Sequence, residues 1–172
     1  MSVDIVLSPV WGDVTRYETQ QMWFDGIRRK YVVAYLAGPP CETWSQAREV
    51  QLEHADRRGP RVVRTLAELW GLGSLSVKEL RQVIVGNELM LFSLYALVLL
   101  SGTGGCGALE HPAEPKKEDS ASIWRTEIVR LLLQVEGFQL LTFAQGLLGA
   151  KSAKPTSLLT LNLPTMGQWI HG

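Results

Sequence analysis

One of the two cysteines lies in a loop that proline makes rigid, and it is the residue best suited to chemistry. Cys41 follows the turn Gly38–Pro40, where proline fixes φ and removes backbone donors. A free thiol has a pKa of about 8.5, and the thiolate form is the nucleophile. We expect a helix after Cys41, whose N-terminus would favour the thiolate. The pattern predicts a nucleophile, with a small buried hydrophobe as the alternative.

Two further side chains belong to the same expected helix. Ser45 lies one turn after Cys41 and Arg48 lies two turns after it. In a helix these three residues line one face. We therefore expect Ser45 and Arg48 to bind substrate beside the thiol.

Two carboxylates follow other predicted strands. Asp13 comes just after the predicted strand 3–10, and Glu110 ends the predicted strand 106–110. In open α/β sheets, ligands bind outside the carboxyl ends of the strands, so both residues are expected near Cys41. The alternatives are a turn or helix-cap role for Asp13 and a surface position for Glu110.

The elements that must position these residues alternate between strands and helices. Strands are expected over 3–10, 31–37, 106–110, 138–143 and 157–163, and helices over 15–30, 77–101 and 123–135. The run 31–37 is continuously apolar, which favours an interior strand buried on both faces. The sequence therefore predicts an α/β fold, with a mainly parallel sheet of about five strands and helices on both faces.

The longest predicted helix has clear boundary signals. Ser76 is its expected N-cap, and the glycines of 102–105 end it, which we prefer to a dinucleotide-binding motif because no strand precedes them. The preceding segment 49–76 is predicted to be an irregular insertion with a short helix over 64–70. Its arginines, which are Arg57, Arg58, Arg61 and Arg64, are interpreted as a solvated group.

Bulk composition restricts the class of protein. The 172 residues suit one domain covering 1–172, with 46% hydrophobic and 20% charged residues. Seventeen basic and 17 acidic residues cancel, which argues against indiscriminate nucleic-acid binding. The apolar run 89–100 is too short to span a bilayer and no signal peptide is evident, so we expect a soluble intracellular protein without a membrane role. The histidines and Cys106 lack metal-ligand spacing, so no metal is predicted.

Several motifs together resemble one enzyme family. Pro40 and Cys41 followed by Ser45 resemble the Pro-Cys-x-x-x-Ser signature of cytosine-5 DNA methyltransferases. The segment 12–15 is similar to the Gly-Asp-Ile-Thr type of segment in that family. Leu-Glu-His-Pro at 109–112 stands where those enzymes carry Glu-Asn-Val. The resemblance covers roughly residues 3–163 and implies an incomplete Rossmann-like methyltransferase fold.

The resemblance also implies roles for these residues. Cys41 would attack C6 of cytosine, while Glu110 would hydrogen-bond N3 and the exocyclic amine. Asp13 and Pro40 would contact the cofactor S-adenosylmethionine. DNA is the implied partner, with the target base flipped out of the duplex or already single-stranded.

The sequence departs from the family at two places. Lys151 and Lys154 stand where the family has a Gln-x-Arg-x-Arg segment, and we expect them to bind substrate at the rim of the site. The family's Phe-x-Gly-x-Gly cofactor loop has no counterpart before Val3. The predicted strand 3–10 then forms an exposed edge, which would accept a partner chain or form a homodimer.

Three functional interpretations remain open from the sequence. The chain is a methyltransferase-like fragment that is weakly active or silent alone, an active methyltransferase completed by a partner chain, or an unrelated thiol enzyme using Cys41 with a histidine. The three differ in whether the chain can bind S-adenosylmethionine by itself.

Overall fold

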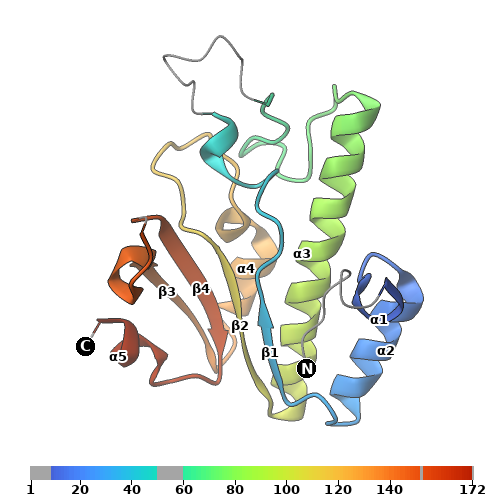
Figure 1. Ribbon diagram of the computed structural model, residues 1–172, viewed down its shortest axis with the longest axis vertical. Coiled ribbons are helices and arrows are strands. Elements are labelled where there is room, and N and C mark those ends of the chain that lie inside the picture. Colours follow the sequence, from blue (N-terminus) through green and yellow to red (C-terminus); the bar gives the residue numbers. More distant parts are fainter. Residues whose placement is uncertain (1–8, 50–59, 152, 172) are drawn as a thin grey trace.

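The computed structural model describes residues 9–49, 60–151 and 153–171, and these form a mixed α/β fold with an open four-stranded sheet (Figure 1). The strands lie in the order β1-β2-β4-β3. Their bounds are β1 Ala34–Ala37, β2 Cys106–Pro112, β3 Phe138–Ala144 and β4 Pro155–Leu161. The α/β class predicted from the sequence is confirmed.

The sheet is mixed, so the prediction of a mainly parallel sheet is only partly confirmed for the described residues. β1 and β2 are parallel, with Ala37 opposite Leu109, while β4 is antiparallel to both β2 and β3. The reason is how the strands are connected. A helix carries the chain from β1 to β2, as parallel pairing requires, whereas only residues 145–154 join β3 to β4.

Helix α3 (Val77–Thr103) makes the connection between β1 and β2, and its ends are where the sequence predicts them. The Ser76 hydroxyl accepts a hydrogen bond from the Glu79 amide, and the Glu79 carboxylate accepts one from the Ser76 amide. This capping box satisfies two amides that the helix leaves unpaired. Gly104 ends the helix in the left-handed conformation at φ 75°, which glycine adopts without strain.

Helices α2 (Tyr17–Arg28), α3 and α4 (Glu127–Leu132) share one hydrophobic core with one face of the sheet. Strand side chains of that face, such as Leu109, Leu159 and Phe138, belong to the same cluster. The short helix α5 (Met166–His171) reaches the other face, where Gly167 lies beside Leu141. Helices therefore cover both faces, but very unequally.

Several predicted elements differ from the structure. Strand β1 lies at an edge of the described sheet rather than in its interior, and Leu36 is 76% exposed. Most of the predicted strand 3–10, and the edge assigned to it, lies outside the described residues; Pro9 and Val10 begin the short helix α1 (Pro9–Gly12). The predicted short helix over 64–70 does not form; residues 66–70 are a bend and a turn.

The predicted helix 123–135 is also divided in the structure. A 3-10 turn, η2 (Ile123–Arg125), precedes the shorter α4. Thr126 separates them with extended backbone, and its hydroxyl accepts a hydrogen bond from the Val129 amide. This local N-cap starts a new helix, so the amphipathic pattern does not continue as one element.

Helix α3 is long and apolar enough to cross a membrane by length and composition alone. Half of its most apolar window is buried inside the protein, as in the core helix of a soluble protein. The other half is not buried, and α3 therefore also contributes apolar side chains to the surface.

Candidate active site

The loop that carries Cys41 begins directly after β1 and is anchored by the two residues that follow Glu42. Thr43 and Trp44 are 7% and 2% exposed, while Cys41 is half-buried. The Trp44 amide donates to the Cys41 carbonyl at 3.0 Å, which closes the turn. The thiol therefore lies near the surface, in a loop that Thr43 and Trp44 anchor in the core.

The helix predicted after Cys41 is absent from this described segment. A turn leads instead into the 3-10 helix η1 (Gln46–Arg48). A helix turns successive side chains about 100° apart, whereas Thr43 and Trp44 both enter the interior. Ser45 and Arg48 consequently do not share a helical face with the thiol, and no helix N-terminus supports the thiolate.

Glu110 lies beside the loop that carries Cys41. Its position in β2 is one residue beyond Leu109, the partner of Ala37 at the end of β1. The Glu110 Oε2 atom is 3.7 Å from the place that a Cβ would take on Gly38. The carboxylate thus lies against the glycine that opens the Gly38–Pro40 turn, at the carboxyl ends of the two parallel strands.

The two predicted lysines have different environments. Lys154 Nζ forms an ion pair with Glu110 Oε1 at 3.6 Å, and both side chains are partly exposed. Lys151 is exposed, and no ion pair involves it within the described part of the chain. The structure brings Lys154, but not Lys151, together with Glu110. Glu110 Oε1 is itself buried without a hydrogen-bond partner among the described residues.

His111 points away from Glu110, because successive side chains of a strand face opposite sides. It is 1% exposed and packs edge-on against Trp124, with ring centroids 6.2 Å apart. Burial, with a smaller contribution from Lys154, lowers the pKa of His111 to about 3. The predicted strand 106–110 is too short, since β2 continues past Glu110 and pairs with β4 through Pro112.

Asp13 and Arg48 have structural partners. The Asp13 carboxylate accepts hydrogen bonds from the Thr15 amide and hydroxyl at 3.2 and 2.6 Å. The Arg48 guanidinium donates to the carbonyls of Glu42 and Arg61 and to Gln82 Oε1. Asp13 therefore has the turn role that was the alternative interpretation. Arg48 joins the Cys41 loop, the irregular insertion and α3 instead of presenting a free guanidinium.

A groove of about 340 Å³ lies beside Pro40, between its loop and α3. Its lining is mostly apolar and includes Val85 and Leu89, with Arg81 and Glu42 among the polar lining residues. Asp13 does not line this groove. The two residues assigned to the cofactor by resemblance therefore do not meet in one described cavity.

Sequence reasoning missed Arg64, which is 2% exposed. Its guanidinium donates to Leu69 O, Asn87 Oδ1, Thr43 Oγ1 and Val83 O at 2.7–3.1 Å. Within the described residues no carboxylate pairs with it. Burial, followed by repulsion from Arg48, lowers its pKa to about 10. The apolar pair Val62-Val63 before it is the one sequence signal that separates it from the solvated arginines.

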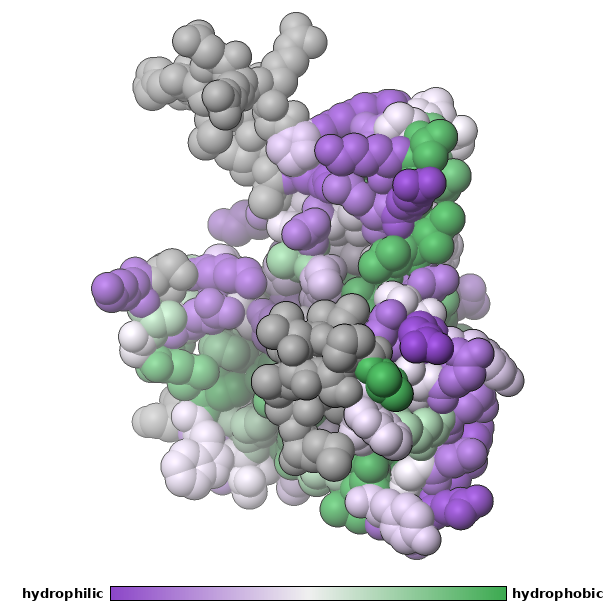
Figure 2. Space-filling model, turned by 45° about the vertical axis from the view of Figure 1, so that its right-hand side comes forward, coloured by the Kyte–Doolittle hydropathy of each residue, from purple (hydrophilic) through white to green (hydrophobic). Residues whose placement is uncertain are grey.

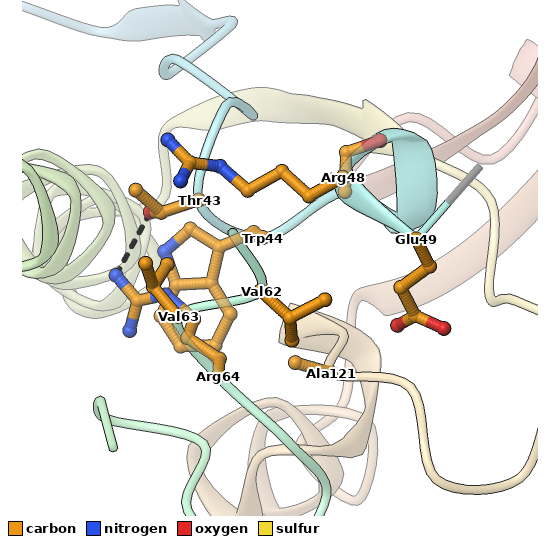
Figure 3. Close-up of a pocket in the computed structure, with 9 residues that line it drawn as sticks. Thr43, Trp44, Arg48, Glu49, Val62, Val63, Arg64 and Ala121 are labelled. Carbon is orange, nitrogen blue, oxygen red and sulfur yellow. Dashed lines mark hydrogen bonds between the residues drawn. The ribbon is translucent and has the colours of Figure 1, made fainter. Parts of the chain in front are cut away.

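Figure 3 shows how Arg64 meets the loop after Cys41. The guanidinium lies by the Trp44 ring, and the dashed line marks its hydrogen bond to Thr43. The cavity beside these residues holds only about 10 Å³, the room of one water molecule. Arg64 is therefore a support for the loop and not the wall of a ligand pocket.

Comparisons with protein-family models, with curated proteins and with solved structures found no match for this chain. No group of three or more histidine, cysteine or acidic side chains converges within the described residues as a metal site would require. The geometry around Cys41 and Glu110 is therefore the basis for proposing a function.

Proposed function

We propose that the chain is a cytosine-5 methyltransferase-like fragment, with an incomplete Rossmann-like fold, that binds a cytosine ring but lacks its own methyl-donor site. One observation carries the proposal. The Glu110 carboxylate lies against Gly38 of the Cys41 loop and is paired with Lys154. A carboxylate with a cation beside it, against the loop that carries the candidate nucleophile at the ends of parallel strands β1 and β2, supports the roles that the resemblance implies.

Glu110 Oε1 fits this role, because it is buried without a hydrogen-bond donor among the described residues and has only the longer ion pair with Lys154 at 3.6 Å. A buried acceptor without a donor is costly, and a ligand that supplies an N–H removes that cost. The exocyclic amine of cytosine is such a donor, and N3 of the same edge lies next to it. Glu110 would then hold the ring by that edge while the Cys41 thiolate approaches C6.

The proposed chemical step is a reversible addition. The Cys41 sulfur forms a bond to C6, the C5–C6 π pair moves to C4–C5, the C4–N3 π pair moves to N3, and N3 takes up a proton donated through Glu110. C5 then takes a proton from solvent. Loss of the original C5 hydrogen, expulsion of the thiolate and return of the N3 proton to Glu110 give cytosine with a solvent-derived hydrogen. No methyl donor is needed for this exchange.

Single-stranded DNA is the substrate we favour. Reaching C6 inside a duplex requires flipping the base, which costs a few kcal/mol. The balanced charge of 17 basic and 17 acidic residues offers little electrostatic affinity to offset that cost. Lys154, whose side chain is 42% exposed, is positioned to contact a phosphate near the bound base.

The described residues do not fit S-adenosylmethionine, and we assign it no step. Asp13 Oδ1 accepts two hydrogen bonds from Thr15, and the groove at Pro40 does not include Asp13. One hydrogen bond contributes about 0.5 to 1.5 kcal/mol, against roughly 4 kcal/mol or more lost on capturing a small molecule. We therefore expect weak or no cofactor binding and little methyl transfer by the chain alone.

The test is hydrogen exchange at C5 of cytosine in single-stranded DNA, followed by tritium release from the labelled base. We expect slow exchange that Cys41→Ser abolishes and that the matched variant Cys106→Ser leaves unchanged. Both cysteines are half-buried, so the pair controls for general loss of a thiol. Absence of exchange in the unmodified chain would reject the cytosine site.

Two parallel measurements separate the alternative interpretations. Calorimetric titration with S-adenosylmethionine and labelled methyl incorporation should both be negative for the chain alone. Robust methyl transfer abolished by Cys41→Ser would identify a complete enzyme. Alkylation of Cys41 without any exchange at C5 would favour a thiol enzyme of another kind. His111 does not supply that enzyme's base, because it faces the core.

A further inference from the structure

The N-terminal half of α3 carries an exposed apolar stripe that nothing in the described structure covers. Val77, Leu80, Ile84 and Leu91 are 69%, 46%, 44% and 41% exposed. Their spacing of three, four and seven residues keeps them on one face of the helix. Figure 1 shows this half of α3 rising above α2, and Figure 2 shows apolar side chains along the upper right of the molecule, over the same half.

Helix α2 covers the same face of α3 farther along. Phe24 of α2 stacks on Phe92 and meets Tyr95 edge-on, with centroids 5.2 and 4.8 Å apart. Helix-on-helix packing therefore already occurs on this face, and it stops where α2 ends. The open half has the composition of a surface that accepts one more helix.

Two charged residues, Arg81 and Glu88, lie within the stripe and restrict which partner can bind it. Arg81 and Glu88 are exposed, and neither has an ion pair or hydrogen bond from its side chain within the described residues. They are seven residues apart, two turns of helix, so both lie on the stripe about 10 Å from each other. A partner helix must offer an acidic and a basic side chain at the same spacing and in the opposite direction.

We propose that the stripe is the contact between two copies of this chain, with the two α3 helices antiparallel. A two-fold axis between Ile84 and Val85 sets Arg81 of each copy opposite Glu88 of the other. The same patch then serves both partners, as a closed dimer requires. Val77 of one copy falls beside Leu91 of the other, so apolar and charged positions match together.

The groove beside Pro40 supports this arrangement. Its walls include Val85 and Leu89, at the edge of the stripe. In the antiparallel pairing the two copies of Val85 lie next to the two-fold axis, so the groove borders the contact on the side of Val85. A lipid surface would instead have to accept Arg81 and Glu88 in its apolar contact, which is unfavourable.

Sedimentation equilibrium of the full chain tests the proposal through a charge exchange. We expect a dimer whose dissociation constant rises on the order of tenfold or more in either Arg81→Glu or Glu88→Arg, since each reversal sets like charges opposite each other twice. Mixing the two variants restores both attractions, so the equimolar mixture forms a heterodimer. Arg130→Glu on α4, an exposed position away from the stripe, is the control and leaves dimerisation unchanged.

Three outcomes would overturn the proposal. The unmodified chain could be monomeric at all concentrations, the single reversals could dimerise like the original, or the mixture could show no recovery. Flotation with phosphatidylcholine vesicles is run in parallel. Vesicle binding that Ile84→Asp removes would assign the stripe to a membrane surface and reject the dimer. Because Arg81 and Glu88 have no described partners, their variants are expected to fold normally, which circular dichroism verifies.

Discussion

The guanidinium of Arg64 lies over the indole ring of Trp44, with 3.8 Å between the Arg64 Cζ atom and the ring centroid. This contact joins the irregular insertion to the residues that follow Cys41. The cation is held by neutral acceptors and an aromatic face, without a described carboxylate. The position of the Cys41 loop thus depends on a residue 23 positions later in the chain.

Replacing Arg64 by lysine should therefore be costly. Lysine keeps a positive charge, but it lacks the planar guanidinium that donates hydrogen bonds to four acceptors and stacks on Trp44. We expect the free energy of unfolding to fall by about 3 kcal/mol, measured by urea denaturation. Arg61→Lys is the control, because Arg61 is half-exposed and should lose less than about 1 kcal/mol. Equal losses in the two variants would contradict the supporting role of Arg64.

A glycine in α3 allows this contact. A Cβ on Gly86 would lie 2.7 Å from Thr43 Oγ1 and 3.2 Å from Arg64 Nη2. Gly86→Ala should lower the free energy of unfolding by about 1 to 3 kcal/mol, although alanine is the better helix former. Gly102→Ala, in the same helix with nothing within 4 Å of its Cβ, should raise it by up to about 1 kcal/mol. Thermal unfolding of both variants provides the comparison, and a stabilised Gly86→Ala would show that the loop does not press on α3.

Burial of His111 predicts acid sensitivity. Its pKa is lowered from 6.5 to about 3, so the unfolded chain binds a proton below about pH 6.5 that the folded chain does not. The stability present above pH 6.5 is therefore lost as pH falls toward 3, with a limiting slope of about 1.4 kcal/mol per pH unit. Between pH 7 and 5 we expect a loss on the order of 2 kcal/mol from this residue. In His111→Phe, denaturation curves at the two pH values should lack this component; an unchanged slope would reject it.

Lys154 and Lys151 should differ in their effect on the proposed exchange at C5 of cytosine. Glu110→Gln should slow exchange by about 100-fold or more, the usual contribution of a general acid. Lys154→Met removes the ion partner of Glu110 and should slow exchange about fivefold, as expected for a partly exposed pair worth about 1 kcal/mol. Lys151→Met, the matched control, should have no effect. If Lys151→Met and Lys154→Met slow the exchange equally, both lysines contribute only through their positive charge and the ion pair with Glu110 has no specific role.

Local signals in the sequence predicted several elements well. The boundaries of α3 follow from Ser76, Glu79 and the glycines after residue 101, which act within a few residues of each other. The strand at 138–143 was also predicted nearly as the structure has it. Capping and short apolar runs depend on neighbours in the chain, so the sequence by itself determined these features.

Tertiary structure decided the rest, because it depends on partners far apart in the chain. The place of β4 between β2 and β3 results from pairing such as Leu109 with Leu159, 50 residues apart, and no local pattern encodes it. The burial of Arg64 likewise requires Thr43 and Val83 to meet around it. A charged residue enters the interior only when acceptors from separate segments surround it. The sequence thus determined which side chains were available for chemistry, and folding determined that Glu110 meets the Cys41 loop, that Arg48 donates to that loop at Glu42, and that Asp13 bonds to Thr15.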